Sequence, residues 1–379
     1  MIINRKTFPF KAFYFIVYAA LAALLPYLAV YYESLGLSGQ QIGTLAAIPP
    51  LVTFLSAPLI GAITDVSQRH KLILGISILG FSGSVLAIWA VRSFWGLIPV
   101  IVFYAFFLAP IFPLIDRSVL NILGNRKDQY GKQRMWGAVG WGIMGPIAGL
   151  LIELGGLRWA FYGCFIVSLG LMIILQATPI QQISIRNRFA EGLKRLFANW
   201  SVGFFFVIMV IGGMGLSMIH NYFFIYLDGL GANSILKGWS LTIATFSELV
   251  VMFFSDKLLK RWKANWLVAL SLLVLACRLF LYAVVRSPEI ALLVQLLHGP
   301  TFGLIWVAGV SYVGEITPPG LGNTVQGFFS GIVMGLGSAL GAFLGGVLYK
   351  SIGFSLMFMI LGGVVLLSGL SFVVTNPKH

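Results

Sequence analysis

Residues 179–200, PIQQISIRNRFAEGLKRLFANW, form the longest polar stretch between the apolar runs of this sequence. Of the 379 residues 59% are hydrophobic and 9% are charged, whereas about 25% are charged in an ordinary soluble domain. This composition excludes a soluble globular protein and a disordered chain, because neither could keep so much apolar surface away from water. The polar stretch therefore separates two groups of membrane-embedded segments.

Six apolar runs lie on each side of this stretch, each close to the length of about 20 residues that a spanning helix needs. Their continuous apolarity predicts helices and excludes the short alternating strands of a membrane β-barrel. We predict an all-α integral membrane protein with two six-helix domains, 1–177 and 201–379, and a cytoplasmic linker at 178–200. The twelve predicted transmembrane spans are 12–32, 42–63, 72–91, 95–116, 135–154, 158–177, 202–224, 239–257, 266–286, 289–311, 325–348 and 354–374.

The 25 lysine and arginine residues are distributed unevenly around these spans. Nineteen of them lie at the two ends of the chain or around the loops after spans 2, 4, 6 and 8, and five lie on the other side. Because positive residues accumulate on the cytoplasmic side, we predict that both termini are cytoplasmic and that the membrane is the inner (cytoplasmic) one. The net charge of +14 then reflects topology and an anionic lipid surface, and no nucleic-acid partner is expected.

The two groups of spans resemble each other. The pattern PxFxLI at 110–115 in span 4 recurs at 300–305 in span 10. Asp65 and the basic residues after it recur as Asp256 and its basic followers. Two such repeats typically place a substrate site between them near the middle of the membrane, and rocking of the halves opens it to each side in turn. We therefore predict two six-helix repeats.

Charged and polar residues inside the apolar spans are functional candidates, because a charge at the membrane centre costs about 2.5–3.5 kcal/mol on insertion scales. We predict that Asp116 pairs with Arg134 and, separately, that Glu248 pairs with Arg278, since an arginine can neutralise a buried carboxylate. A purely structural role between helices is the alternative for His298 and for the pair of Glu248 and Arg278. The candidates are Asp116, Arg134, Glu248, Arg278, Gln295 and His298.

The loop GAITDVSQRHK, residues 61–71, resembles the loop signature of the major facilitator superfamily, in which a glycine and an aspartate precede basic residues. The matching residues here are Gly61, Asp65, Arg69 and Lys71. The resemblance is consistent with a cytoplasmic charge latch, with Asp65 near a helix N-terminus. A solvated loop that only sets topology is the alternative.

The segment YGKQRMWGAVGW, residues 130–141, resembles the start of span 5 in the lactose permease and its relatives. In that family a sugar-binding arginine precedes by seven residues a tryptophan that stacks on the sugar, and Arg134 and Trp141 have this spacing. Asp116 resembles the carboxylate that pairs with the arginine, and the 18 residues from Asp116 to Arg134 also fit. Packing within the bilayer is the alternative role for Trp141.

The second half also resembles the lactose permease, since Arg278 and His298 are 20 residues apart and Glu248 matches its span 8 acid. The sequence departs at Thr301, where the permease has a proton-binding glutamate, and at Gln295, where it has a lysine. The run that contains both positions, QLLHGPTF, resembles instead the phenylpropionate permease branch, which is proton-coupled and related to lactose and nucleoside symporters. Lactose is therefore doubtful as the substrate.

These observations predict a monomeric secondary transporter in the bilayer that couples a proton to the uptake of a sugar, a nucleoside or an aromatic acid. Glu248 is the predicted proton carrier and Asp116 a second acid, because an arginine that moves away changes a carboxylate's proton affinity. A solute carboxylate is expected to replace Glu248 beside Arg278, so that acids compete better than their amides. The predicted solute-binding residues are Asp116, Arg134, Trp141, Arg278, Gln295 and His298.

Other classes are weighed beside this one. Gly145-Pro146-x-x-Gly149 partly resembles the signature of drug/proton antiporters, but Trp141 and Leu150 stand where glycines are expected. A receptor or scaffold with a transporter fold would not need acids and arginines matched in depth. An enzyme, a metal or a cofactor is not expected, since the sequence lacks HExxH, a suitable nucleophile elbow, a phosphate-binding loop and a cysteine–histidine cluster.

Overall fold

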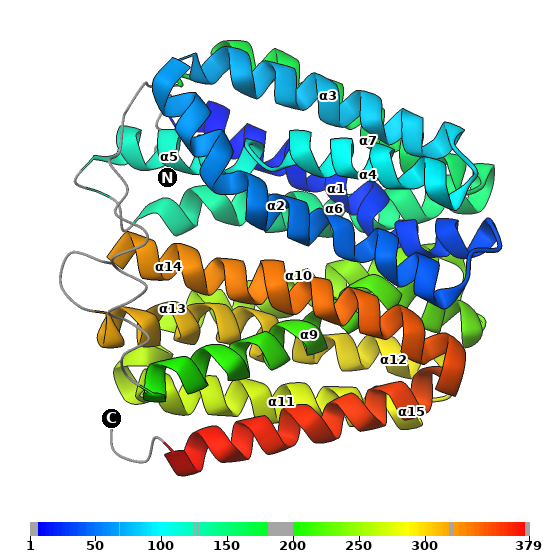
Figure 1. Cartoon of the computed structure of the whole chain (residues 1–379), viewed down its shortest axis with the longest axis vertical. Coiled ribbons are helices and arrows are strands. Elements are labelled where there is room, and N and C mark those ends of the chain that lie inside the picture. The colour runs from blue at the N-terminus through cyan, green and yellow to red at the C-terminus, as the bar shows by residue number, and fades with distance from the viewer. Residues whose placement is uncertain are drawn as a thin grey trace. The chain divides into compact units, whose positions relative to one another are not determined.

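The computed structural model describes residues 7–67, 69–124, 126, 129–180, 200–317 and 322–375, with the backbone alone at 57–67, 201 and 322–324. Within these residues every regular element is a helix (Figure 1). Ten helical stretches are long and apolar enough to cross a membrane. The predicted linker falls outside the described residues between 181 and 199.

The helices coincide with the predicted spans. The prediction 42–63 falls on α2 (Gly39–Ser67), while 325–348 and 354–374 fall on a single stretch that Gly353 divides with a φ of 79°. The count of twelve and the internal repeat therefore stay predictions. The other helices are α1 (Phe8–Ser34), α3 (His70–Ala90), α4 (Phe94–Leu108), α5 (Ile111–Leu123), α6 (Tyr130–Gly155), α7 (Arg158–Ala177), α9 (Trp200–Gly229), α10 (Ser234–Arg261), α11 (Ala264–Val284), α12 (Pro288–Val294), α13 (Leu304–Ile316), α14 (Gly322–Ser330) and α15 (Ser338–Thr375).

Local sequence sets several helix ends. The hydroxyl of Ser93 accepts a hydrogen bond from the Gly96 N–H at the start of α4, and Ser287 accepts one from Ile290 at the start of α12. These side chains satisfy backbone donors that the first helical turn leaves free. Gly156 ends α6 with a φ of 81°, a left-handed conformation that glycine adopts without steric cost.

The contacts group the chain into two compact units. The first contains Met1–Leu37, Leu51–Ile185 and Ala232–Thr242, and in it α1 packs against α6 and α7 while α3 packs against α4 and α7. Aromatic and small side chains of α1 form much of the core of this unit. The domain boundaries predicted at 177 and 201 stay predictions, because the segment Ala232–Thr242 packs with the first unit.

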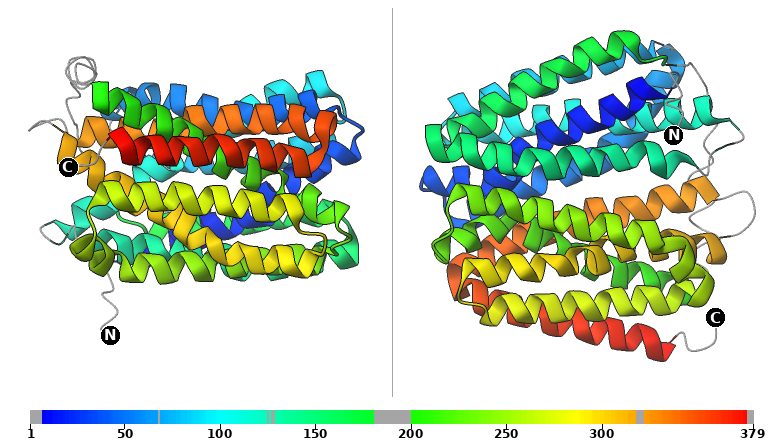
Figure 2. Two further views of the ribbon diagram at one scale, coloured as in Figure 1. Left: turned by 90° about the horizontal axis from the view of Figure 1, so that it is seen from below. Right: turned by 180° about the vertical axis from the view of Figure 1, so that it is seen from behind.

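The second unit contains Ser38–Pro50, Arg186–Gly231 and Ile243–His379. Here α15 packs against α9 and α11, and α11 and α15 run side by side in both views of Figure 2. The N-terminal end of α2 also belongs to this unit and packs against α15. This unit also contains the polar residues of α10, of α11 and of the segment between α12 and α13 that are described below.

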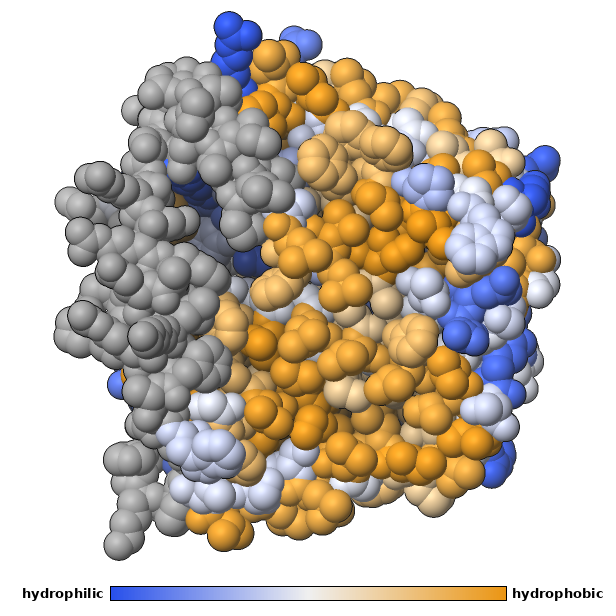
Figure 3. Space-filling model, viewed as in Figure 1, coloured by the Kyte–Doolittle hydropathy of each residue, from blue (hydrophilic) through white to orange (hydrophobic). Residues whose placement is uncertain are grey.

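Large apolar side chains cover the outer faces of the helices. Figure 3 shows a broad hydrophobic surface over the helices of one face, with hydrophilic residues gathered toward one edge. Ile173, Phe253 and Leu154 are 74%, 81% and 78% exposed. Exposed apolar residues in such number are stable in lipid and not in water, so the chain is a multi-pass membrane protein.

Candidate functional site

The first polar cluster lies in the first unit, on α1, α5 and α6. Oδ2 of Asp116 on α5 lies 3.8 Å from Nη1 of Arg134 in the first turns of α6. The Arg134 and Asp116 side chains are 38% and 25% exposed, so the pair is partly open. The predicted Asp116–Arg134 pairing is confirmed.

Three tyrosines complete this cluster. The Tyr14 hydroxyl donates to Oδ1 of Asp116 at 2.5 Å, so the carboxylate has a partner at each oxygen. Arg134 donates from Nη1 to the Tyr130 hydroxyl at 3.2 Å and from Nη2 to the Tyr18 hydroxyl at 3.5 Å. The hydroxyls add hydrogen bonds to an ion pair, which is the arrangement that a partly buried pair needs.

Sequence reasoning singled out neither Tyr14 nor Tyr130. The signal was present in the spacing: Tyr14 and Tyr18 are one helical turn apart on α1, and so are Tyr130 and Arg134 on α6. Residues four apart share a helix face, but the sequence does not show which face of α1 meets α5 and α6.

Trp141 lies on α6, seven residues after Arg134, and is half-buried. Two helical turns separate these residues, so they share one face of α6. Between them, Gly137 lies so close to α1 that an added Cβ would meet the ring of Tyr18. The predicted arginine–tryptophan face is therefore present, and its contact with a solute stays a prediction.

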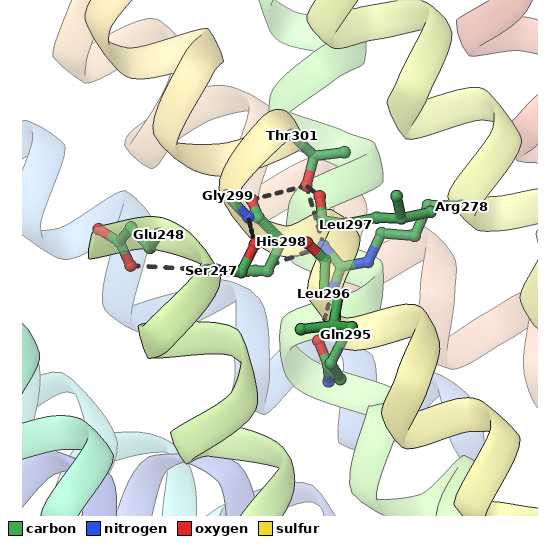
Figure 4. A network of polar contacts seen from close by, with 9 residues as sticks. All are labelled: Ser247, Glu248, Arg278, Gln295, Leu296, Leu297, His298, Gly299 and Thr301. Atoms are coloured by element: carbon green, nitrogen blue, oxygen red, sulfur yellow. Dashed lines mark hydrogen bonds and ion pairs between the residues drawn. The ribbon is translucent and has the colours of Figure 1, made fainter. Parts of the chain in front are cut away.

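The second polar cluster lies in the second unit and is drawn in Figure 4. Its centre is Arg278 on α11, which is 1% exposed. Nη2 donates to Oε1 of Gln295 at 2.5 Å, and Nη1 donates to the Thr301 hydroxyl at 3.0 Å. Nε donates to the hydroxyl of Tyr282, one turn further along α11, at 3.4 Å.

His298 lies between Arg278 and Glu248. Nδ1 of His298 is 3.3 Å from Nη1 of Arg278, and Nε2 is 3.8 Å from Oε2 of Glu248 on α10 (Figure 4). The predicted direct pairing of Glu248 with Arg278 is therefore wrong. The physical reason is that Arg278 donates to Gln295, Thr301 and Tyr282. The imidazole of His298 lies between its guanidinium and the Glu248 carboxylate.

The donors of Arg278 also set the tautomer of His298. A guanidinium has no acceptor, so the Nδ1 atom facing it must accept the hydrogen bond. A neutral imidazole then carries its proton on Nε2, which faces Glu248. The ring thus presents a donor to the carboxylate, and its plane is held by stacking on Phe302 at a centroid distance of 5.3 Å.

Burial separates the predicted solute ligands of this cluster. Arg278 and Gln295 are 1% and 4% exposed, whereas the side chains of His298 and Glu248 are 25% and 16% exposed. In this structure the histidine and the glutamate are partly exposed, and the guanidinium is buried. Thr301, which the sequence marked only as the place of a missing acid, is a buried partner of Arg278.

The helix that carries His298 is broken. It runs as α12 to Val294, as a 3₁₀ turn over Gln295–Leu297, as a π-helical turn over Gly299–Gly303 and then as α13. Such turns inside a helix often mark functional sites. We refer to Pro288–Ile316 as the broken helix.

The predicted loop motif is only partly described. Only the backbone is described at Gly61 and Asp65. Arg69 is exposed before α3, and Nζ of Lys71 donates to the carbonyl of Gln176 at the end of α7 at 2.9 Å. A cation at a helix C-terminus satisfies a free carbonyl and complements the helix dipole, so Lys71 ties α3 to α7.

The described part of the chain gathers no three His, Cys, Asp or Glu side chains that could hold a metal ion. What it gathers are two acid–cation clusters inside membrane-spanning helices. Ionisable residues in such positions are typical of secondary transporters, in which they bind solutes and ions.

Comparison with known proteins agrees with this class. The chain belongs to the MFS_1 like family of the major facilitator superfamily, whose family model matches residues 8–360. It is accordingly a permease-type transporter and not an enzyme.

Several relatives align along nearly the whole chain. It is 26% identical over 368 residues to the "Uncharacterized transporter YwbF" of Bacillus subtilis, covering 95% of this chain and 91% of the relative. It is 26% identical to the "Maltose permease" of Geobacillus stearothermophilus, covering 91% and 88%, and 24% identical to the "Probable 3-phenylpropionic acid transporter" of Escherichia coli, covering 90% of each.

Among solved structures, the nucleoside transporter NupG superposes with a TM-score of 0.85 at 16% identity and covers 100% of this chain and 100% of that one. At this identity the likeness shows the fold alone. It agrees with the helical architecture described above.

Proposed function

We propose that this protein is a proton-coupled symporter that takes up a small organic solute by alternating access. One observation carries the proposal: Glu248 lies on a membrane-spanning helix, partly exposed, with a carboxylate oxygen 3.8 Å from Nε2 of His298. The proposal places a single copy in the cytoplasmic membrane with both termini in the cytoplasm, as the distribution of basic residues supports.

A structural role explains this arrangement poorly. A buried ion pair is often no more stable than apolar residues of similar volume, and an ionisable group inside a membrane is costly. Glu248 also has a polar partner in the imidazole of His298, which faces it at 3.8 Å. Gain and loss of a proton would change how strongly the carboxylate holds His298, and two states with different proton affinity couple protonation to conformation.

The first cluster supports a polar solute. Asp116 and Arg134 are partly exposed and surrounded by tyrosine hydroxyls, which suit hydroxyl-bearing ligands. Trp141, on the same face of α6 as Arg134, offers an apolar plane for a sugar ring or an aromatic ring. Relatives named for maltose, raffinose, nucleosides and 3-phenylpropionic acid define the panel of solutes to test.

The structure does not support the expectation that solutes with a carboxylate compete better than their amides. That expectation assumed that a solute acid replaces Glu248 beside Arg278, but Arg278 is buried and bonded to Gln295, Thr301 and Tyr282. A solute acid and its neutral amide are therefore proposed to compete equally well at this cluster.

Contacts between helix ends support the alternating-access part of the proposal. On α6 and α10, Gly145 and Gly238 approach so closely that a Cβ on either would meet the carbonyl of the other. The Thr242 hydroxyl donates to the Gly142 carbonyl at 2.7 Å, and the Ser234 N–H donates to the Glu153 carboxylate at 2.8 Å. We call this contact of α6 with α10 a seam. By the predicted topology it lies on the side of the membrane opposite to the termini.

A second seam joins α2 to α15. A Cβ on Gly346 would meet the Gly39 carbonyl, and a Cβ on Gly43 would meet the carbonyl of Phe343. Close backbone contact without interlocking side chains lets helices pack tightly and also separate without repacking a core. We propose that contacts of this kind loosen and re-form during the transport cycle.

The test is solute-driven proton movement in proteoliposomes that contain a pH-sensitive dye. Maltose, raffinose, uridine and 3-phenylpropionate are added outside in turn, and the internal pH is recorded beside uptake of the labelled solute. Symport predicts uptake with acidification of the lumen for at least one solute. Alkalinisation would indicate the drug/proton antiporter alternative, and binding without uptake would indicate a receptor; either result contradicts the proposal.

A further inference from the structure

We propose that Ser247 is a positioning residue: its hydroxyl ties the broken helix to α10 and holds His298 in place against Glu248. The inference rests on the proposed role of Glu248 in proton coupling. Ser247 precedes Glu248 on α10 and is buried. Its hydroxyl donates to the carbonyl of Leu296 and accepts from the N–H of Gly299 at 3.1 Å.

The sequence of the broken helix explains why the Leu296 carbonyl needs this donor. In an α-helix it would accept a hydrogen bond from the N–H four residues later, at residue 300. Residue 300 is proline, which has no N–H. In a membrane no water is at hand to replace the missing donor, so the Ser247 hydroxyl takes its place.

The N–H of Gly299 is freed by the same break. Its α-helical acceptor would be the carbonyl of Gln295, but the 3₁₀ turn gives that carbonyl to the N–H of His298. The Ser247 oxygen accepts the displaced N–H of Gly299. A single hydroxyl thus bonds both the carbonyl whose α-helical donor Pro300 removes and the N–H whose α-helical acceptor is bonded to His298.

The two helices approach at backbone distance at this point. A Cβ on Gly299 would meet the carbonyl group of Ser247 and also its hydroxyl. The approach therefore requires glycine on one helix and favours a small side chain on the other. Glycine here brings the helices together, and the hydroxyl fixes their register.

The two hydrogen bonds of the Ser247 hydroxyl, which we call the clamp, hold the backbone on both sides of His298 (Figure 4). Leu296 precedes His298 by two residues, and Gly299 follows it directly. The ring of His298 faces Glu248, which is the residue after Ser247. A shift of α10 against the broken helix would therefore change the clamp and the Glu248–His298 distance together. Through this link Ser247 would affect proton coupling at Glu248, and not only the stability of the two helices.

The experiment is the thermal midpoint of the purified full-length protein recorded over a range of pH, which needs no solute. A change of the midpoint with pH that is present in the parent and absent in Glu248→Gln is assigned to Glu248. We call it the Glu248 step. In Ser247→Ala this step is expected to move by about half a pH unit or more, because His298 no longer has a fixed place beside the carboxylate. The matched control is Ser271→Ala, since Ser271 is a buried serine whose hydroxyl donates to the Val268 carbonyl within its own helix α11.

A second variant separates positioning from simple satisfaction of the backbone. Ser247→Ala with Pro300→Ala restores a backbone N–H for the Leu296 carbonyl, so the thermal midpoint is expected to recover while the Glu248 step stays displaced. This double variant also carries the test if Ser247→Ala alone does not fold.

Three results overturn the proposal. The first is a midpoint of Ser247→Ala that is lowered equally at every pH, as in Ser271→Ala. The second is a double variant in which the Glu248 step returns to its parent pH, and the third is a pH dependence of the midpoint that Glu248→Gln leaves unchanged. Absence of solute-driven proton flux in the parent would instead refute the proposed function. That result leaves the pH profile, and hence the test of the clamp, intact.

Discussion

Oε2 of Glu248 lies 3.8 Å from Nε2 of His298, on the side of the imidazole ring opposite to Arg278. The three residues come from α10, the broken helix and α11, so the contact depends on the packing of three helices. The proposed proton coupling would therefore depend on the chain Glu248–His298–Arg278.

The Asp116–Arg134 pair gives a first prediction. Reversing one charge, as Asp116→Arg or Arg134→Asp, should lower the level of folded protein and its thermal midpoint, and the double swap should restore part of both. Breaking a fully buried pair costs about 3–5 kcal/mol, and partial exposure of these side chains brings the cost below that range. The matched control is Glu289→Lys, at an exposed position. Single reversals that behave like this control would show that the two residues are not partners.

Tyr14 and Tyr31 form a contrasting pair of tyrosines on α1. Tyr14→Phe removes the donor to Asp116, and we expect the Kd of a transported solute to rise about tenfold, a loss of about 1.4 kcal/mol. Tyr31→Phe removes the donor to carbonyls at the end of α3, including that of Ile88, and should lower the thermal midpoint without changing affinity. Ligand-induced thermal shifts measure both quantities. Equal effects of the two substitutions on affinity would contradict a role of the Asp116 cluster in binding.

Arg278 should not tolerate lysine. Its planar fork serves Gln295, Thr301 and His298 from fixed directions, and an ammonium group cannot reproduce that geometry. Arg278→Lys leaves buried acceptors unsatisfied at about 1–3 kcal/mol each, so we expect a lower thermal midpoint and loss of transport. Arg286→Lys, at an exposed arginine bonded to Ser355, is the control. If both variants keep the parent midpoint, the network around Arg278 contributes little.

The seam between α6 and α10 predicts a strict requirement for glycine. Gly238→Ala places a methyl group against the Gly145 carbonyl and should destabilise the protein by about 1–3 kcal/mol, as overpacking does. At Gly170 an added Cβ would lie 3.9 Å from Ile16, so Gly170→Ala should be tolerated. Thermal midpoints compare the two, and a Gly238→Ala variant as stable as Gly170→Ala would argue against the seam.

The sequence predicts depth along a helix much better than direction around it. It correctly paired Asp116 with Arg134, because the resemblance to one family covered both residues and their spacing. It placed Glu248 and Arg278 at similar depth and paired them wrongly, since depth does not show that His298 stands between them. Hydropathy located the helices for a similar reason, because bilayer thickness sets the length of each apolar run.

The residues that the sequence missed act through geometry. Tyr14 reaches Asp116 across 102 positions of the chain, and Thr301 accepts a hydrogen bond from Arg278 at the π-helical turn of the broken helix. Ser247 has a purpose only once Pro300 has removed a backbone donor from a neighbouring helix. Such contacts depend on the rotation of packed helices, which composition and spacing do not specify.

The most direct test of proton coupling compares two transport modes of Glu248→Gln in proteoliposomes, with a solute that the parent accumulates. A carrier that cannot release a proton should still exchange labelled for unlabelled solute, but it should not accumulate solute when a pH gradient is imposed. We therefore predict exchange near the parent rate with accumulation reduced to equilibration. Accumulation at the parent level would contradict the account, and loss of both modes would assign Glu248 to binding or structure instead.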